Sequence, residues 1–298
     1  MPYIQTRDGA RLHYHDVGRG EPVVLLHGFA MPAALWLPFA LPLAYRFRFI
    51  LPDLRGFGRS HGVKLSDDCL LTQHANDVAD LFETLDLRGV RLGGLSMGAC
   101  TAMQYHRLHG FERVRSYLHI DQSPCVRNTD DWRHGLLGEL QSARLGGWQD
   151  LMTRMEPYRD LAYEALPADL RRELWASLSE FFDYAFHHRG WKWVTRLARH
   201  ERLIRRIAPT SNWPIYLDSV RSYLEDDYDW RPTLPQLRVP MTALIGEDSI
   251  MYPAEGQRAI ADLVPHARLV NFERCGHAIP FEAPRQFNRE LRRFLATT

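Results

Sequence analysis

The chain has 298 residues, of which 45% are hydrophobic and 11% aromatic, so it can bury a sizeable core as one large domain or two smaller ones. Its 37 basic and 36 acidic residues leave a net charge of +1, which gives no reason to expect a nucleic acid or an anionic membrane as a partner. No apolar run has the length of a membrane span, and the N-terminus lacks the pattern of a signal peptide. The four cysteines are widely spaced without a CxxC pair, which favours a reduced, cytoplasmic protein.

The first part of the chain alternates between strand and helix patterns. Polarity alternates on both sides of Asp8-Gly9, which predicts a hairpin with a type I′ turn. Continuous apolar runs then predict strands that are buried on both faces, and helical periodicity predicts helices between them. The predicted strands are 22–28, 47–53, 89–94 and 115–121, and the predicted helices are 33–45, 68–86 and 96–110.

The alternation stops between residues 123 and 236, a mostly helical region that holds seven of the eight tryptophans. It resumes with strands at 241–248 and 267–273 and helices near 254–264 and 283–296. Alternating strands and helices predict a mostly parallel sheet with helices on both faces. We therefore expect a core domain of residues 1–122 and 237–298. Residues 123–236 are expected to form a helical cap over the sheet edge where open α/β folds bind ligands.

One serine lies at a predicted junction between strand and helix, in the pattern Gly94-Leu95-Ser96-Met97-Gly98. A tight turn there exposes the hydroxyl, and bulky side chains two positions away on either side would collide with the strand and the helix. The N-terminus of the following helix favours developing negative charge. The pattern predicts that Ser96 is a catalytic nucleophile.

A serine nucleophile needs a base and an oxyanion hole. His277 follows the last predicted strand, in a loop that can reach across the strand tips to Ser96. The backbone N–H of Met97 and that of Phe29, which follows Gly28, are the expected oxyanion donors. No histidine set has the spacing of a metal site, so no metal is expected.

Together the serine motif, His277, the His27-Gly28-Phe29 turn and the loop 53–60 make the whole chain resemble the α/β-hydrolase fold family. The resemblance implies a mostly parallel eight-stranded sheet with flanking helices and an inserted helical cap. It also implies the chain order Ser, Asp, His for the catalytic residues. We expect Gly28, Trp36 and Leu95 to contact the substrate.

The position of the triad acid departs from the usual family pattern. That acid usually follows the strand predicted at 241–248, but Ser249 stands at the expected place and Asp248 is one residue early. Some members instead carry the acid after the strand that follows the serine's helix, where this chain has Asp121. Asp121 is favoured, and Asp248 remains the alternative.

These features predict a serine hydrolase of carboxylic esters or lactones that forms an acyl-enzyme and needs no cofactor. The aromatic cap suggests a medium-sized, largely apolar small-molecule substrate. Alternatives on the same fold are a cofactor-free perhydrolase or haloperoxidase, a C–C bond hydrolase, a dioxygenase or a ligand receptor without catalysis. The Arg-rich segment 193–207 could bind an acidic partner, although a solvated helix face is favoured. Monomer and homodimer both remain open.

Overall fold

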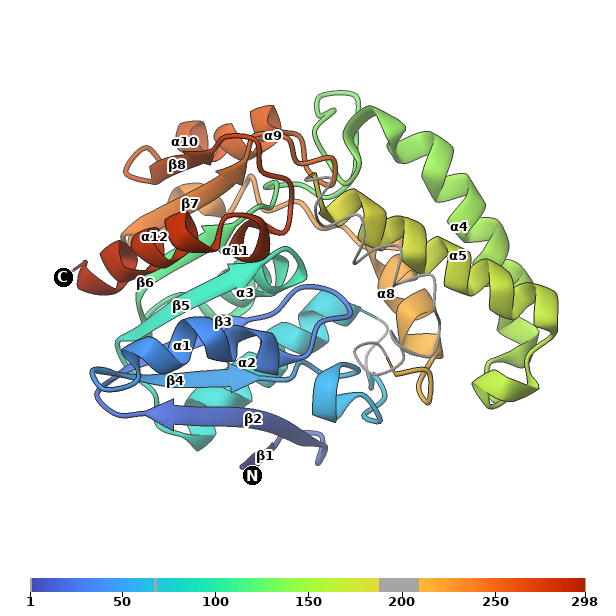
Figure 1. Cartoon of the computed structure of the whole chain (residues 1–298), viewed down its shortest axis with the longest axis horizontal. Helices are drawn as coiled ribbons and strands as arrows, with labels where there is room; N and C mark the ends of the chain where they lie inside the picture. The colour runs from blue at the N-terminus through green and yellow to red at the C-terminus, as the bar shows by residue number, and fades with distance from the viewer. Residues whose placement is uncertain (1, 67–68, 188–208, 298) are drawn as a thin grey trace.

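An eight-stranded sheet in the order β1-β2-β4-β3-β5-β6-β7-β8 forms the centre of the molecule (Figure 1). The computed structural model describes residues 2–66, 69–187 and 209–297, so the Arg-rich segment 193–207 lies outside the described residues. Strands β3 to β8 are parallel, and β1 and β2 are antiparallel to their neighbours. The strands are Tyr3–Gln5, Arg11–Gly18, Glu21–Leu26, Phe47–Pro52, Val90–Leu95, Val114–Ile120, Met241–Gly246 and Arg268–Phe272. This architecture confirms the predicted fold class.

The first hairpin differs from its prediction in the turn that joins β1 to β2. A type I′ turn needs positive φ at both central residues, but only Gly9, with φ of 83°, has it at Asp8-Gly9. The Gly9 N–H donates to the Thr6 carbonyl and the Thr6 N–H donates to the Ala10 carbonyl, which makes a longer loop. The predicted hairpin is present, and the predicted turn type is wrong.

Helices cover both faces of the sheet. On one face, α2 and α3 pack with α10 in a large apolar cluster, and α9 precedes α10. On the other face, α1, α11 and α12 pack in a second cluster. These helices are α1 Leu37–Ala40, α2 Leu70–Thr84, α3 Met97–His109, α9 Ala254–Arg258, α10 Ile260–Leu263, α11 Ile279–Glu282 and α12 Pro284–Ala296. The predicted helix at 33–45 is divided into three short pieces because Pro38 and Pro42 each lack an N–H donor.

Three longer helices of the described residues between β6 and β7 lie beside the edge of the sheet at which the parallel strands end (Figure 1). They are α4 Gln141–Met155, α5 Ala168–Ala185 and α8 Pro214–Glu225. Single-turn 3₁₀ helices complete the described elements: Ala33–Trp36, Leu41–Leu43, Gly58–Ser60, Gly138–Leu140, Glu156–Tyr158, Tyr163–Ala165 and Leu234–Gln236. Among the helices of the described residues, none combines the length and the apolarity needed to cross a membrane.

Candidate active site

Ser96 stands between β5 and α3 in a strained backbone conformation, with φ of 54° and ψ of −118°. A side chain on Gly94 would collide with the Gly98 carbonyl, and one on Gly98 would collide with the Leu26 carbonyl of β3. Both glycines are therefore required for α3 to begin this close to the sheet. The turn leaves Ser96 only 7% exposed, at the carboxyl end of a central strand.

His277 and Asp121 are brought together from the ends of two other segments. Asp121 directly follows β6 and is fully buried, and His277 lies in the loop between β8 and α11. The Nδ1 atom of His277 lies 2.5 Å from Oδ2 of Asp121. A buried carboxylate in this place fixes the tautomer of the imidazole, so that Nε2 is left to accept a proton.

Asp248, the alternative acid, lies elsewhere. Its side chain is 40% exposed, and its Oδ2 lies 3.7 Å from Nε2 of His187. The geometry thus pairs His277 with Asp121 and directs Asp248 to the surface. Sequence reasoning did not assign roles to Ser249 or Gln257, which donate hydrogen bonds to the Asp121 carboxylate.

One expected oxyanion donor directly follows Ser96, and the other belongs to the loop after β3. Met97 is the first residue of α3, so its N–H has no acceptor within the helix. Phe29 follows Gly28, and a Cβ on Gly28 would lie 3.6 Å from the Cβ of Ser96. The loop that carries Phe29 therefore passes directly beside the candidate nucleophile.

His27 holds this loop in place. Its Nε2 accepts a hydrogen bond from the Leu54 N–H at 2.9 Å, so Nδ1 carries the proton and donates to the Gly28 carbonyl at 2.8 Å. Burial lowers the pKa of His27 and keeps the ring neutral. His27 is thus a structural support of the loop and not a second base.

The described residues contain one cluster with the composition of a metal site, formed by His13, His15 and Asp53. Asp53 accepts hydrogen bonds from His13 Nδ1 at 2.7 Å, from the Ala33 N–H at 2.7 Å and from the Arg59 N–H at 3.1 Å. These donors already occupy both carboxylate oxygens. We assign the cluster to anchoring the loops that follow β3 and β4.

The three expected substrate contacts differ in their positions. Trp36 is completely buried, with ring centroids 6.2 Å from Phe39 and 6.1 Å from Phe287. This placement is that of a core residue and corrects the expected substrate contact. Leu95 belongs to the same apolar cluster, whereas Gly28 lies against Ser96.

An apolar cavity of about 30 Å³ lies between Phe29 and the helices α4, α5 and α8. The Phe29 ring lies 5.0 Å from that of Phe181 on α5 and 5.8 Å from that of Tyr216 on α8. The remaining lining residues are Trp148, Leu151, Met152, Leu174, Ser177, Leu178, Leu217 and Val220. The space beside the candidate oxyanion loop is therefore almost entirely apolar.

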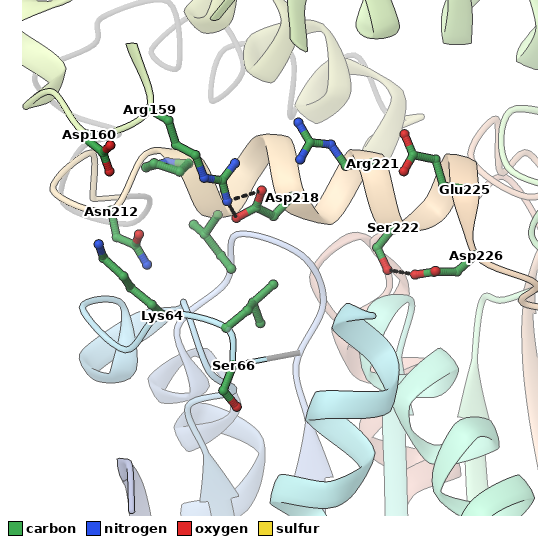
Figure 2. Close-up of a pocket in the computed structure, with 13 residues that line it drawn as sticks. Lys64, Ser66, Arg159, Asp160, Asn212, Asp218, Arg221, Ser222, Glu225 and Asp226 are labelled. Atoms are coloured by element: carbon green, nitrogen blue, oxygen red, sulfur yellow. Dashed lines mark hydrogen bonds and ion pairs between the residues drawn. The ribbon is translucent and has the colours of Figure 1, made fainter. Parts of the chain in front are cut away.

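A larger cavity, of about 470 Å³, lies between residues 64–66 and one side of α8 (Figure 2). Its lining carries charges of both signs, among them the ion pair between Arg159 and Asp218 at 2.7 Å. None of the candidate catalytic residues is among its lining residues. Although this cavity is the larger of the two, it is therefore not the candidate active site.

The end of α5 is tied to the loop that carries His277. The Ala278 N–H donates to the Ala185 carbonyl at 2.9 Å. The carboxylate of Glu282 accepts from the Gly276 N–H through Oε1 and from the His187 N–H through Oε2, both at 3.1 Å. The position of the candidate base thus depends on a helix of the inserted region.

Comparisons with known proteins bear on the family and the fold of the chain. A sequence model of the alpha/beta hydrolase fold matches residues 21–284. The chain is 28% identical to a non-heme chloroperoxidase of Kitasatospora aureofaciens, over 99% of both chains. It is 27% identical to a pimeloyl-[acyl-carrier protein] methyl ester esterase of Nitrosomonas europaea, over 93% of this chain and 97% of that protein.

Among solved structures, an esterase from Exiguobacterium antarcticum is similar with a TM-score of 0.79 and 21% identity, over 99% of both chains. That likeness extends across the sheet and the helices inserted between β6 and β7. The match to the family over most of the chain, together with this shared architecture, shows that the chain belongs to the alpha/beta hydrolase fold family.

Proposed function

We propose that this enzyme is a serine hydrolase that cleaves a carboxylic ester or lactone through an acyl-enzyme. The observation that carries the proposal is the buried hydrogen bond between His277 Nδ1 and Asp121 Oδ2, together with Ser96 in its strained turn. The relative named as a methyl ester esterase supports ester chemistry.

In the proposed mechanism, Ser96 Oγ attacks the substrate carbonyl while Nε2 of His277 takes its proton. The N–H groups of Phe29 and Met97 stabilise the oxyanion, and Asp121 stabilises the imidazolium. The imidazolium then gives its proton to the leaving alcohol. Water, deprotonated by His277, releases the acid from Ser96.

Residues 123–236 act as a cap over this site in our proposal, with residues 1–122 and 237–298 as the catalytic core. The apolar lining of the cavity between Phe29 and helices α4, α5 and α8 supports a largely apolar substrate. The medium size of the substrate stays a prediction from the aromatic residues of the cap. Cys100, Cys125 and Cys275 form no disulfide, which supports a reducing, cytoplasmic location in this proposal.

A perhydrolase is the second candidate, favoured by the relative named as a non-heme chloroperoxidase. Hydrogen peroxide would replace water in the second step and attack the carbonyl of the acyl-enzyme. The acyl group would then leave Ser96 as a peracid, and the serine hydroxyl would be restored. The two candidates share the acyl-enzyme and differ only in the acceptor that releases it.

The first test is to measure kcat/KM for the wild type and Ser96→Ala on esters and lactones of increasing size, with and without hydrogen peroxide. We expect strong hydrolysis that is lost in Ser96→Ala, because the attack on the carbonyl needs the hydroxyl. Peracid formation that exceeds hydrolysis would favour the second candidate. Turnover that is indifferent to Ser96→Ala would overturn both.

A second test compares Asp121→Asn with Asp248→Asn. We expect Asp121→Asn to lower kcat by about 10⁴ with the fold intact, because the amide favours the wrong tautomer of His277. Asp248→Asn serves as the control and should change kcat by less than about tenfold, since its carboxylate lies at the surface. If neither variant loses more than about tenfold, the assignment of the acid is wrong.

A further inference from the structure

The carboxylate of Asp121 receives four hydrogen bonds, and only one of them comes from His277. Oδ2 accepts from His277 Nδ1 at 2.5 Å and from Ser249 Oγ at 2.7 Å. Oδ1 accepts from the Gly246 N–H at 2.9 Å and from Gln257 Nε2 at 3.0 Å. The three additional donors all come from the end of β7 and the twelve residues that follow it, down to α9.

The directions of the two side-chain donors are fixed by their other contacts. The Tyr252 N–H approaches Ser249 Oγ at 3.4 Å, which leaves the hydroxyl proton of Ser249 to point at Asp121. Gln257 Nε2 also donates to the Tyr252 carbonyl at 2.9 Å. Turning the amide of Gln257 over would place its oxygen against two other oxygens, so the nitrogen must face Asp121.

These four hydrogen bonds compensate the carboxylate of Asp121 for its loss of contact with water. A fully buried carboxylate is costly unless its lone pairs are paired, and two oxygens offer about four such positions. Each oxygen of Asp121 has two donors, so the carboxylate cannot rotate without breaking several hydrogen bonds. The orientation of Oδ2 toward His277 is therefore held by groups that lie outside the triad.

We propose that Ser249 and Gln257 are positioning residues, which hold the Asp121 carboxylate in the orientation that aligns His277, and that position 249 is itself within reach of His277. This inference rests on the proposed function of Ser96, His277 and Asp121. Ser249 acts on the base only through Asp121, and neither residue touches the reacting atoms.

The reach of position 249 follows from two adjoining distances. Ser249 Oγ lies 2.7 Å from the oxygen that itself lies 2.5 Å from His277 Nδ1. An aspartate at 249 extends one bond beyond Oγ, into the space that this oxygen occupies. Asp121 has φ of 46°, a conformation that glycine adopts readily. Asp121→Gly therefore empties the space of the Asp121 carboxylate without adding backbone strain.

The first experiment measures kcat and KM for Ser249→Ala and Gln257→Leu on the best ester found for the wild type. We expect kcat to fall roughly 10- to 100-fold with KM unchanged, the effect of removing one hydrogen bond to a charged group. Ser219→Ala is the matched control, because Ser219 is a buried serine of α8 whose Oγ donates to the Ile215 carbonyl at 2.6 Å. Its kcat should stay within about twofold of the wild type.

The second experiment moves the acid. Asp121→Gly should lose about 10⁴ in kcat, and Asp121→Gly with Ser249→Asp should recover at least tenfold of it. Thermal unfolding of each variant separates loss of fold from loss of alignment. If the double variant folds but recovers nothing, position 249 does not reach His277.

Unchanged kcat in both Ser249→Ala and Gln257→Leu would overturn the positioning role and leave the proposed function intact. A fall in kcat that is matched by Ser219→Ala would overturn it too, because the effect would then be one of general packing. Retained activity in Ser96→Ala would instead refute the proposed function. The two ideas can therefore fail separately.

Discussion

At the scale of single residues, steric necessity explains why the serine turn can be read from the sequence. Gly94 and Gly98 leave room for backbone carbonyls that any side chain would strike, so the constraint is local and appears within five residues. At this turn Ser96 has a positive φ, which serine rarely adopts.

Gly98→Ala tests this constraint. The added methyl group would meet the Leu26 carbonyl, so α3 must move away from β3, and we expect a loss of about 1–3 kcal/mol in the free energy of unfolding. Gly146→Ala is the matched control, because Gly146 is exposed in α4 with open space around its Cα. That change should stabilise the chain by about 0.5–1 kcal/mol. Urea unfolding measures both, and equal effects would contradict the steric argument.

The acid shows where sequence reasoning stops at this scale. Both Asp121 and Asp248 lie at the ends of predicted strands, and only the three-dimensional arrangement of the strand tips decides which carboxylate meets His277. The support from Ser249 and Gln257 was harder still to foresee, because these residues are 128 and 136 positions away from Asp121. The one signal in the sequence was a serine at the place where the family pattern expects an acid.

At the scale of elements, the parallel strands were predictable because burial on both faces leaves continuous apolar runs. β5 and β7 are buried at every residue. The single helix expected at 33–45 is not formed. Its apolar residues have helical spacing throughout, but Pro38 and Pro42 interrupt the backbone hydrogen bonds that one continuous helix would need. Contacts between elements, such as that of α5 with the His277 loop, leave no local pattern and could not be predicted.

Glu282→Gln tests that contact. Each carboxylate oxygen of Glu282 accepts from a backbone N–H, and a glutamine can accept on one side only. We expect a loss of about 1–3 kcal/mol in the stability of the docked loop and faster hydrogen exchange at the Gly276 and Ala278 amides. The control is Glu139→Gln at an exposed residue, which should leave both amides unchanged. Equal exchange in the two variants would show that Glu282 does not hold the loop.

At the scale of the whole molecule, one apolar cluster runs from the helices on the sheet into the inserted helices. It includes Leu70 of α2 and Met103 of α3 together with Leu151, Leu174 and Leu217 of α4, α5 and α8. The inserted region therefore shares its buried surface with the core and is not a separate globule. Within this interior lie several histidines that are completely buried.

Those histidines make stability depend on pH. Burial lowers the pKa of His74 to about 3 and that of His119 to about 4, from an ordinary value of 6.5, and it lowers the pKa of His27 as well. Between pH 6.5 and 4 the unfolded chain binds protons at these rings while the folded chain does not, so the contribution of these rings to stability falls as the pH falls.

Each such histidine contributes a slope of at most about 1.4 kcal/mol per pH unit. Urea unfolding at pH 7, 6 and 5 measures how steeply the free energy of unfolding changes with pH. His74→Leu should reduce that slope by the contribution of one histidine. The comparison uses slopes, so the lower absolute stability of the variant does not affect it. Identical slopes for the wild type and His74→Leu would refute this account of acid sensitivity.

Phe29 links the inserted helices to the candidate active site through its own ring and its own N–H. Its ring is enclosed by Phe181 and Tyr216 of the inserted helices, and its N–H is the candidate donor to the oxyanion. On the proposed function, a substrate chain that entered the adjoining cavity would press on the ring of Phe29, the same residue whose N–H is expected to meet the developing charge. The length of the substrate chain should therefore change the rate of bond breaking as well as the affinity. In that case kcat itself distinguishes a substrate that fits.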